Sequence, residues 1–142
     1  MRIERVLQDK GGEVTTIEAG ATVADVAKLL SEKRIGAVIV SDGATPAGIL
    51  SERDIVRELG KSGPGCLERT AGDMMTTSLQ SCAPDEHLDE VLSKMTDGRF
   101  RHMPVMKDGK MVGLVSIGDI VKARLSELAM ERDALEGMVR GH

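Results

Sequence analysis

Two stretches of the chain decide the fold: residues 48–56 read GILSERDIV and residues 113–121 read GLVSIGDIV. They stand at an offset of 65 (113 minus 48), and both contain Gly-x-x-Ser-x-x-Asp followed by Ile-Val. Apolar positions outside the stretches agree at the same offset without any insertion, as where Val26 falls on Val91. Self-similarity at one fixed offset is the signature of a repeat, so the sequence predicts two copies of one structural unit.

Each copy is predicted to form a strand, a helix, two further strands and a second helix. The apolar residues Val23, Val26 and Leu30 recur at helical spacing, and Leu88, Val91 and Met95 repeat that spacing in the second copy. Asp-Gly dipeptides at 42–43 and 108–109 predict the turns between the paired strands. The predicted first strands are Val14–Ile17 and Leu79–Cys82, the first helices Thr22–Lys33 and Glu86–Asp97, and the second helices begin at Ser51 and Ser116.

The predicted fold class is α+β, with one domain over residues 1–62 and a second over residues 63–142. A linker is expected over about residues 60–75, because the run KSGPG at 61–65 is rich in turn residues, and a short helical lead-in is expected at Cys66–Met75. The charged tail Ala123–Gly137 has helical composition. It either packs on a partner or covers an edge of its own domain, and the sequence favours neither.

Composition excludes several classes of function. The net charge is −4, and aromatic residues make up 1% of the chain, with Phe100 the one example. A nucleic-acid-binding module needs basic patches or aromatic stacking platforms, so no nucleic acid partner is expected. No run is long and apolar enough to span a membrane, and residues 1–20 lack the apolar core of a secretory signal, so a cytoplasmic protein is predicted. Cys66 and Cys82 suggest neither a disulfide framework nor a metal site.

No motif of an enzyme is present in the sequence. There is no P-loop, no Gly-x-Ser-x-Gly nucleophile elbow and no paired His or Cys with metal-ligand spacing. We therefore predict no catalytic residue, no catalytic cofactor and no enzymatic activity.

The Ser-x-x-Asp pairs have two interpretations. Ser51 with Asp54, and Ser116 with Asp119, suit a capping box at a helix N-terminus. A carboxylate at such a place also accepts hydrogen bonds from a vicinal diol such as a ribose, and unpaired helix N–H groups favour a phosphate. Arg53 lies inside the first block only, whereas Gly118 takes its place in the second. Arg101 and His102, which precede a predicted strand, are candidate phosphate ligands, with exposed surface residues as the alternative.

The repeated blocks, the run of residues 101–121 and AGDMMT at 71–76 resemble a tandem pair of CBS domains, called a Bateman module. The resemblance implies two βαββα repeats packed about a pseudo-twofold axis, with two clefts that bind AMP, ADP, ATP, NAD or S-adenosylmethionine. It further implies a homodimer and a regulatory sensor without catalysis that acts on an unidentified effector protein in trans. The alternative is a scaffold or dimerisation protein that binds no ligand.

The resemblance also assigns site residues. Asp54 and Asp119 would bind ribose hydroxyls, with Ser51 and Ser116 beside them, and Arg53, Arg101 and His102 would serve the phosphates at the Asp54 site. The remaining implied residues are those lining the adenine, Thr16, Ile17, Ser81 and Cys82, and those covering one face of the base, Met103 and Pro104.

Overall fold

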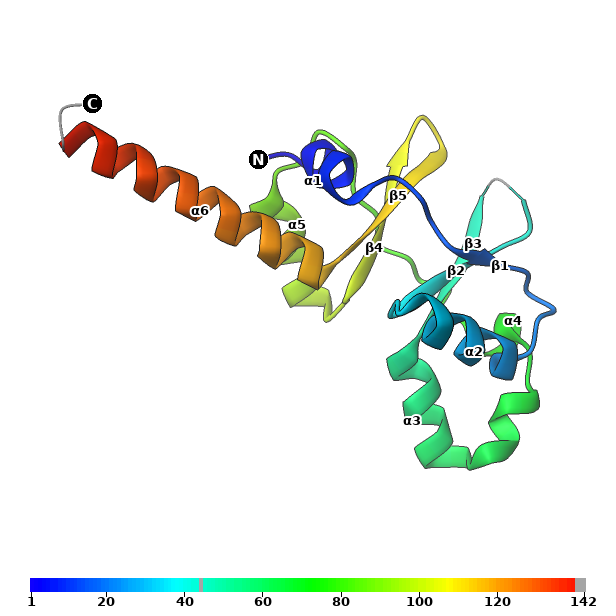
Figure 1. Cartoon of the computed structure of the whole chain (residues 1–142). Coiled ribbons are helices and arrows are strands. Elements are labelled where there is room, and N and C mark those ends of the chain that lie inside the picture. Colours follow the sequence, from blue (N-terminus) through cyan, green and yellow to red (C-terminus); the bar gives the residue numbers. More distant parts are fainter. Residues whose placement is uncertain (44, 140–142) are drawn as a thin grey trace. The chain divides into compact units, whose positions relative to one another are not determined.

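The structure is a computed structural model that describes residues 1–43 and 45–139 (Figure 1). The chain divides into two compact units. The first-repeat unit comprises Glu13–Gln80 with the turn residues Asp108–Met111. The second-repeat unit comprises Met1–Gly12, Ser81–Lys107 and the chain from Val112 onwards. Each unit combines helices with a small sheet, so the predicted α+β class is confirmed.

The first-repeat unit contains a three-stranded sheet of order β1-β2-β3. Strand β1 pairs parallel to β2, and β2 pairs antiparallel to β3. The predicted lead-in forms two short helices rather than one, and Ala44 of the predicted turn lies outside the described residues. The elements are β1 (Thr16–Ile17), α2 (Val23–Lys33), β2 (Ala37–Ser41), β3 (Pro46–Ser51), α3 (Glu52–Ser62), the 3-10 helix η1 (Pro64–Glu68) and α4 (Ala71–Met74).

The second-repeat unit contains a two-stranded sheet, β4-β5. The predicted strand at Leu79–Cys82 is wrong: Cys82 makes one isolated parallel bridge to Val105, and the Leu79 N–H donates to the Thr77 carbonyl, which turns the chain away from an extended path. The turn predicted at Asp108-Gly109 is confirmed, since both residues have positive φ. The elements are α1 (Ile3–Lys10), α5 (Leu88–Gly98), β4 (His102–Lys107), β5 (Lys110–Ser116) and α6 (Ile117–Val139).

The lead-in helices pack on the repeats that they do not precede. Helix α1 comes before the first repeat in sequence but belongs to the second-repeat unit, where its N-cap residue Arg2 bridges the α5 N-cap residue His87. Helix α4 comes before the second repeat but packs in the first-repeat unit, where Thr70 bridges Thr22 in the same way. The sequence analysis missed α1, although Ile3, now fully buried, and Val6 stand at helical spacing.

The two repeat helices have matching faces and ends. The predicted apolar faces are confirmed, because Val23 and Val91 have no exposed surface. Helix α2 ends at Arg34 and α5 at Arg99, both in the left-handed region with φ of 54° and 59°. The core of the first-repeat unit comprises Val23, Val26, Leu30, Val38, Val40, Leu50, Ile55 and Ala71, and that of the second Ile3, Val6, Cys82, Leu88, Val91, Met95, Met103, Val105, Val115 and Ile120.

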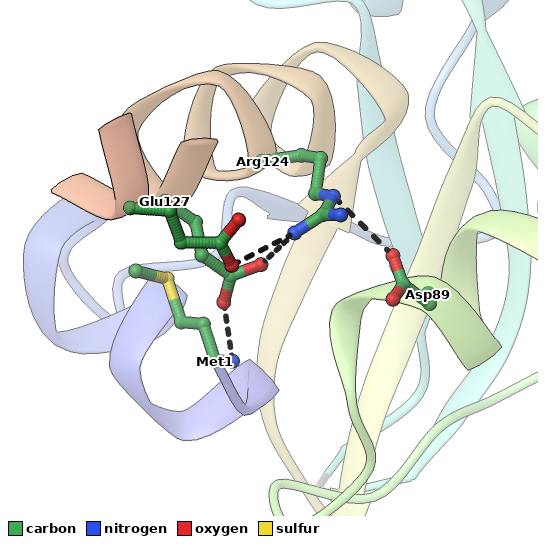
Figure 2. A network of polar contacts seen from close by, with 5 residues as sticks. Met1, Asp89, Arg124 and Glu127 are labelled. Carbon is green, nitrogen blue, oxygen red and sulfur yellow. Dashed lines mark hydrogen bonds and ion pairs between the residues drawn. The ribbon is translucent and has the colours of Figure 1, made fainter. Parts of the chain in front are cut away.

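A polar network joins α6 to Met1, which precedes α1, and to α5 (Figure 2). The guanidinium of Arg124 pairs with Glu127 one turn along α6 and lies 3.6 Å from a carboxylate oxygen of Asp89 on α5. The Met1 ammonium lies 2.5 Å from the other Glu127 oxygen. Past Glu127, α6 continues as the helical tail that the sequence predicts (Figure 1). Leu125 and Leu135 on α6 are largely exposed.

Candidate ligand-binding site

The first Gly-x-x-Ser-x-x-Asp block forms a complete capping box where β3 passes into α3. The Asp54 N–H donates to Ser51 Oγ at 3.2 Å, and Asp54 Oδ2 accepts from the Ser51 N–H at 3.0 Å and from the Ser51 hydroxyl at 2.8 Å. The capping interpretation of the pair is therefore confirmed. Both bonds to the Asp54 carboxylate use Oδ2. Within the described part of the unit, no hydrogen bond reaches Oδ1, and no basic side chain pairs with Asp54.

The second block has the same cap but a different electrostatic partner. The Asp119 N–H donates to Ser116 Oγ at 3.1 Å, and Asp119 Oδ2 accepts from the Ser116 N–H at 2.8 Å. The ammonium of Lys10, the last residue of α1, lies 2.5 Å from the same Oδ2. Burial raises the pKa of Asp119, but the hydrogen bonds from Lys10 and Ser116 lower it more, so this pKa lies below its ordinary value.

The candidate phosphate ligands lie at or next to the first residues of α3 and β4. Arg53 is exposed in the first turn of α3, two residues after Ser51, in the first-repeat unit. Arg101 is exposed just before β4, and its carbonyl accepts the Ile117 N–H at 2.8 Å, which joins the start of β4 to the start of α6. His102, the first residue of β4, is half-buried. Arg101 and His102 both belong to the second-repeat unit.

The residues assigned to the adenine fall into two groups. Thr16 and Ser81 are exposed and Ile17 is half-buried, so their surfaces are open to a ligand. Cys82 and Met103 are core residues, with exposed fractions of 3% and 0%. Pro104 is buried as well: its carbonyl accepts the Cys82 N–H at 3.0 Å. In this state the side chains of these last three residues offer no surface to a base.

A hollow of about 580 Å³ lies in the first-repeat unit between α2 and α3. None of the residues that the sequence assigns to the ligand lines it. Its wall is mainly apolar, with the side chains of Ser31, Arg34 and Glu52 as polar members. The hollow is thus distinct from the Ser51–Asp54 cap. It is lined by Ala27, Leu30, Ser31, Arg34, Ile35, Gly36, Glu52, Ile55 and Val56.

Residues 1–43 and 45–139 contain no helix with the length and hydropathy of a membrane span. They also contain no cluster of three or more His, Cys, Asp or Glu side chains arranged to hold a metal ion.

Fold and site together define a tandem-repeat α+β protein in which a Ser-Asp capping box opens a helix in each repeat. The CBS domain family model matches this chain twice, over residues 10–61 and 71–126. The chain belongs to the CBS domain family, as a tandem pair.

Similar proteins support the same membership. A mitochondrial CBS domain-containing protein of Arabidopsis thaliana is 35% identical over 125 residues, which cover 84% of this chain and 61% of the plant protein. A CBS-domain containing protein from Agrobacterium tumefaciens is 35% identical, with a TM-score of 0.85 over 87% of this chain and 99% of that one. A protein with CBS domains from Burkholderia ambifaria is also 35% identical, with a TM-score of 0.83 over 89% of this chain and 95% of that one.

One structure of the same fold holds ligands. The CBS domain pair of the protein MJ0100 was crystallised with 5′-methylthioadenosine and S-adenosyl-L-methionine. It is 22% identical to this chain, with a TM-score of 0.78 over 89% of this chain and 98% of that one. Adenosyl compounds therefore bind to that CBS pair.

Proposed function

We propose that this chain is a regulatory module that binds an adenosine-containing ligand through the Asp54 carboxylate and catalyses no reaction. The observation that carries the proposal is the state of that carboxylate. Its Oδ2 is held by Ser51, which fixes its orientation, whereas no bond within the described part of the unit uses Oδ1. A fixed carboxylate with an available oxygen at a helix N-terminus is suited to accept hydrogen bonds from the two hydroxyls of a ribose.

The adenosine class is supported by the family. The MJ0100 pair holds two compounds that share an adenosine group but differ in their 5′ substituent. Among AMP, ADP, ATP, NAD and S-adenosylmethionine, the shared part is the nucleoside, so a carboxylate that binds the diol serves all of them. Arg53, Arg101 and His102 are proposed to distinguish among them through phosphate groups, since a guanidinium presents paired donors to phosphate oxygens.

Output to a partner in trans follows from the proposed binding. Ligand binding shifts a conformational equilibrium only by its differential affinity for the two states. We propose that an effector protein responds to this shift. The homodimer and the cytoplasmic location remain predictions from the sequence.

The test is a panel of thermal unfolding measurements with adenosine, AMP, ADP, ATP, NAD and S-adenosylmethionine. A ligand that binds the folded state raises the midpoint in a concentration-dependent manner. We expect such a rise with at least one adenosyl compound and no consumption of it when the mixture is analysed by chromatography. Turnover of the compound would show an enzyme instead.

A scaffold that binds no ligand is the second candidate. The apolar hollow between α2 and α3 favours it, because Val56 on its wall is 67% exposed and offers surface to another protein. Under this alternative, Ser51 and Asp54 serve only as a cap. Unchanged midpoints with every compound of the panel would support the scaffold.

A further inference from the structure

The two capping boxes differ in one contact that the repeat does not predict. The Lys10 ammonium lies 2.5 Å from Asp119 Oδ2, whereas Met75 occupies the position equivalent to Lys10 at the offset of 65, and residues 75–80 contain no Lys or Arg. The two Asp residues occupy equivalent repeat positions, 54 and 119. The exchange of lead-in helices therefore delivers a cation to only one of the two blocks.

Lys10 is held in place by more than the ion pair. Its ammonium also donates to the carbonyl of Leu114, the second residue of the block, at 2.7 Å. Helix α1 ends directly after it, with the Gly11 N–H donating to the Leu7 carbonyl at 2.7 Å. The side chains of Lys10 and Asp119 are 33% and 26% exposed, so the pair is accessible to a competing ligand from solvent.

We infer that Lys10 is a specificity-determining residue of the second block, where its charge weakens Asp119 as an acceptor for a sugar diol. This inference rests on the proposed diol-binding role of the block. The Lys10 ammonium and the hydroxyls of a ribose are both donors, and both require oxygens of the same carboxylate. Lys10 and Ser116 both bond to Oδ2 of Asp119, so among the described residues Oδ1 stays open there as it does at Asp54, but the adjacent ammonium partly neutralises the Asp119 carboxylate and makes it a weaker acceptor. A ligand therefore fills the Asp54 block first.

The size of the effect follows from the exposure of the pair. A partly exposed ion pair of this kind changes an equilibrium by a factor of about five. Removing the ammonium should thus raise the affinity of the second block for adenosine about fivefold and leave the affinity of the first block unchanged. The two blocks should then bind adenosine with more similar affinities.

The test is calorimetric titration with adenosine in an Asp54→Asn background, where the Asp119 block is measured by itself. We compare three forms of that protein: Lys10 unchanged, Lys10→Met and Lys10→Arg. The Met variant should bind adenosine about fivefold more tightly, and the Arg variant, which keeps the cation, should bind like the parent. Lys122→Met, an exposed position on α6, is the matched control and should also bind like the parent.

The outcomes separate the inference from the proposed function. If adenosine binds and Lys10→Met leaves the affinity unchanged, Lys10 is no competitor. If Lys10→Met weakens binding, Lys10 is itself a ligand group, and the inference is overturned while the proposed function stands. If adenosine binds neither to the wild-type protein nor to any variant, the proposed function is overturned, and the inference with it.

Discussion

Leu7 of α1 lies directly over Gly113 of β5: a Cβ atom added to Gly113 would stand 2.6 Å from Leu7 Cδ2. The first repeat shows the same relationship, since a Cβ on Gly48 would stand 2.6 Å from Met75 Sδ and 2.9 Å from the Thr76 carbonyl oxygen. Each lead-in segment crosses the final strand of a repeat at the glycine that begins the Gly-x-x-Ser-x-x-Asp block. The glycine is therefore required by this close approach.

Replacing Gly48 by Ala should lower the free energy of unfolding by about 1–3 kcal/mol, the usual cost of overpacking. The Thr76 backbone cannot yield easily, because it exchanges two hydrogen bonds with Ile49, of 3.0 and 2.8 Å. Gly113→Ala should cost less, since only the Leu7 side chain must move. Urea denaturation measures both changes.

Gly60→Ala is the matched control for these variants. Gly60 lies within α3, and a Cβ there meets no atom within 4 Å. The substitution should raise stability by about 0.5–1 kcal/mol through helix propensity. An equal gain for Gly48→Ala would show that the lead-in segment does not pack as described.

The Lys10–Asp119 pair should make stability depend on pH. The pKa of Asp119 is lower in the folded state than its ordinary value, so its contribution is complete above the unfolded pKa of about 3.9 and is lost as the pH falls below it. Wild-type protein should therefore exceed Lys10→Met in Tm near neutral pH, and this difference should shrink on acidification below about pH 4. A difference that stays constant from about pH 7 to about pH 3 would contradict the ion pair.

The Cys82 thiol should be inert in the folded protein. Burial, followed by the negative charge of Glu86, raises its pKa to about 12, and its exposed fraction is 3%. The reactive thiolate is therefore scarce and inaccessible. In a Cys66→Ala variant, a chromogenic disulfide reagent at about pH 8 should label Cys82 only as fast as the chain unfolds. Rapid labelling under native conditions would disprove this placement.

Arg101→Ala should weaken AMP binding about tenfold and leave adenosine binding unchanged, because a charge-assisted bond to phosphate is lost. Arg132→Ala, an exposed arginine on the distal part of α6, serves as the control. Calorimetric titration with AMP and with adenosine measures the change in affinity for each ligand. Equal losses for AMP and adenosine would remove Arg101 from the phosphate role.

Local patterns predicted much of the fold. The offset between Gly48 and Gly113 identified the repeat, and the spacing of Val23 and Val26 identified a helix whose apolar face is indeed buried. Ser51 and Asp54 form the cap that their spacing predicts. These features depend on neighbours only a few residues apart, so a sequence pattern contains them.

The parts that were missed depend on distant contacts. Lys10 meets Asp119 across 109 residues, and no local pattern specifies that meeting. The strand expected at Leu79–Cys82 did not form, because its one strand pairing is the isolated bridge from Cys82 to Val105. Glu86 was expected to open a helix, but it binds the Ala83 N–H and Lys94 while His87 takes the N-cap position.

The central claim is that Asp54 accepts the sugar hydroxyls of an adenosyl ligand in addition to capping α3. Calorimetric titration of wild-type protein and Asp54→Asn, each with adenosine and 2′-deoxyadenosine, tests it most directly. The Asn side chain keeps an oxygen for the Ser51 N–H, so the cap survives while the charge is lost. We predict that wild-type protein prefers adenosine about tenfold, and that Asp54→Asn loses this preference with little change in Tm. An Asp54→Asn protein that binds adenosine as tightly as the wild type, with the same preference over the deoxy compound, would contradict the account.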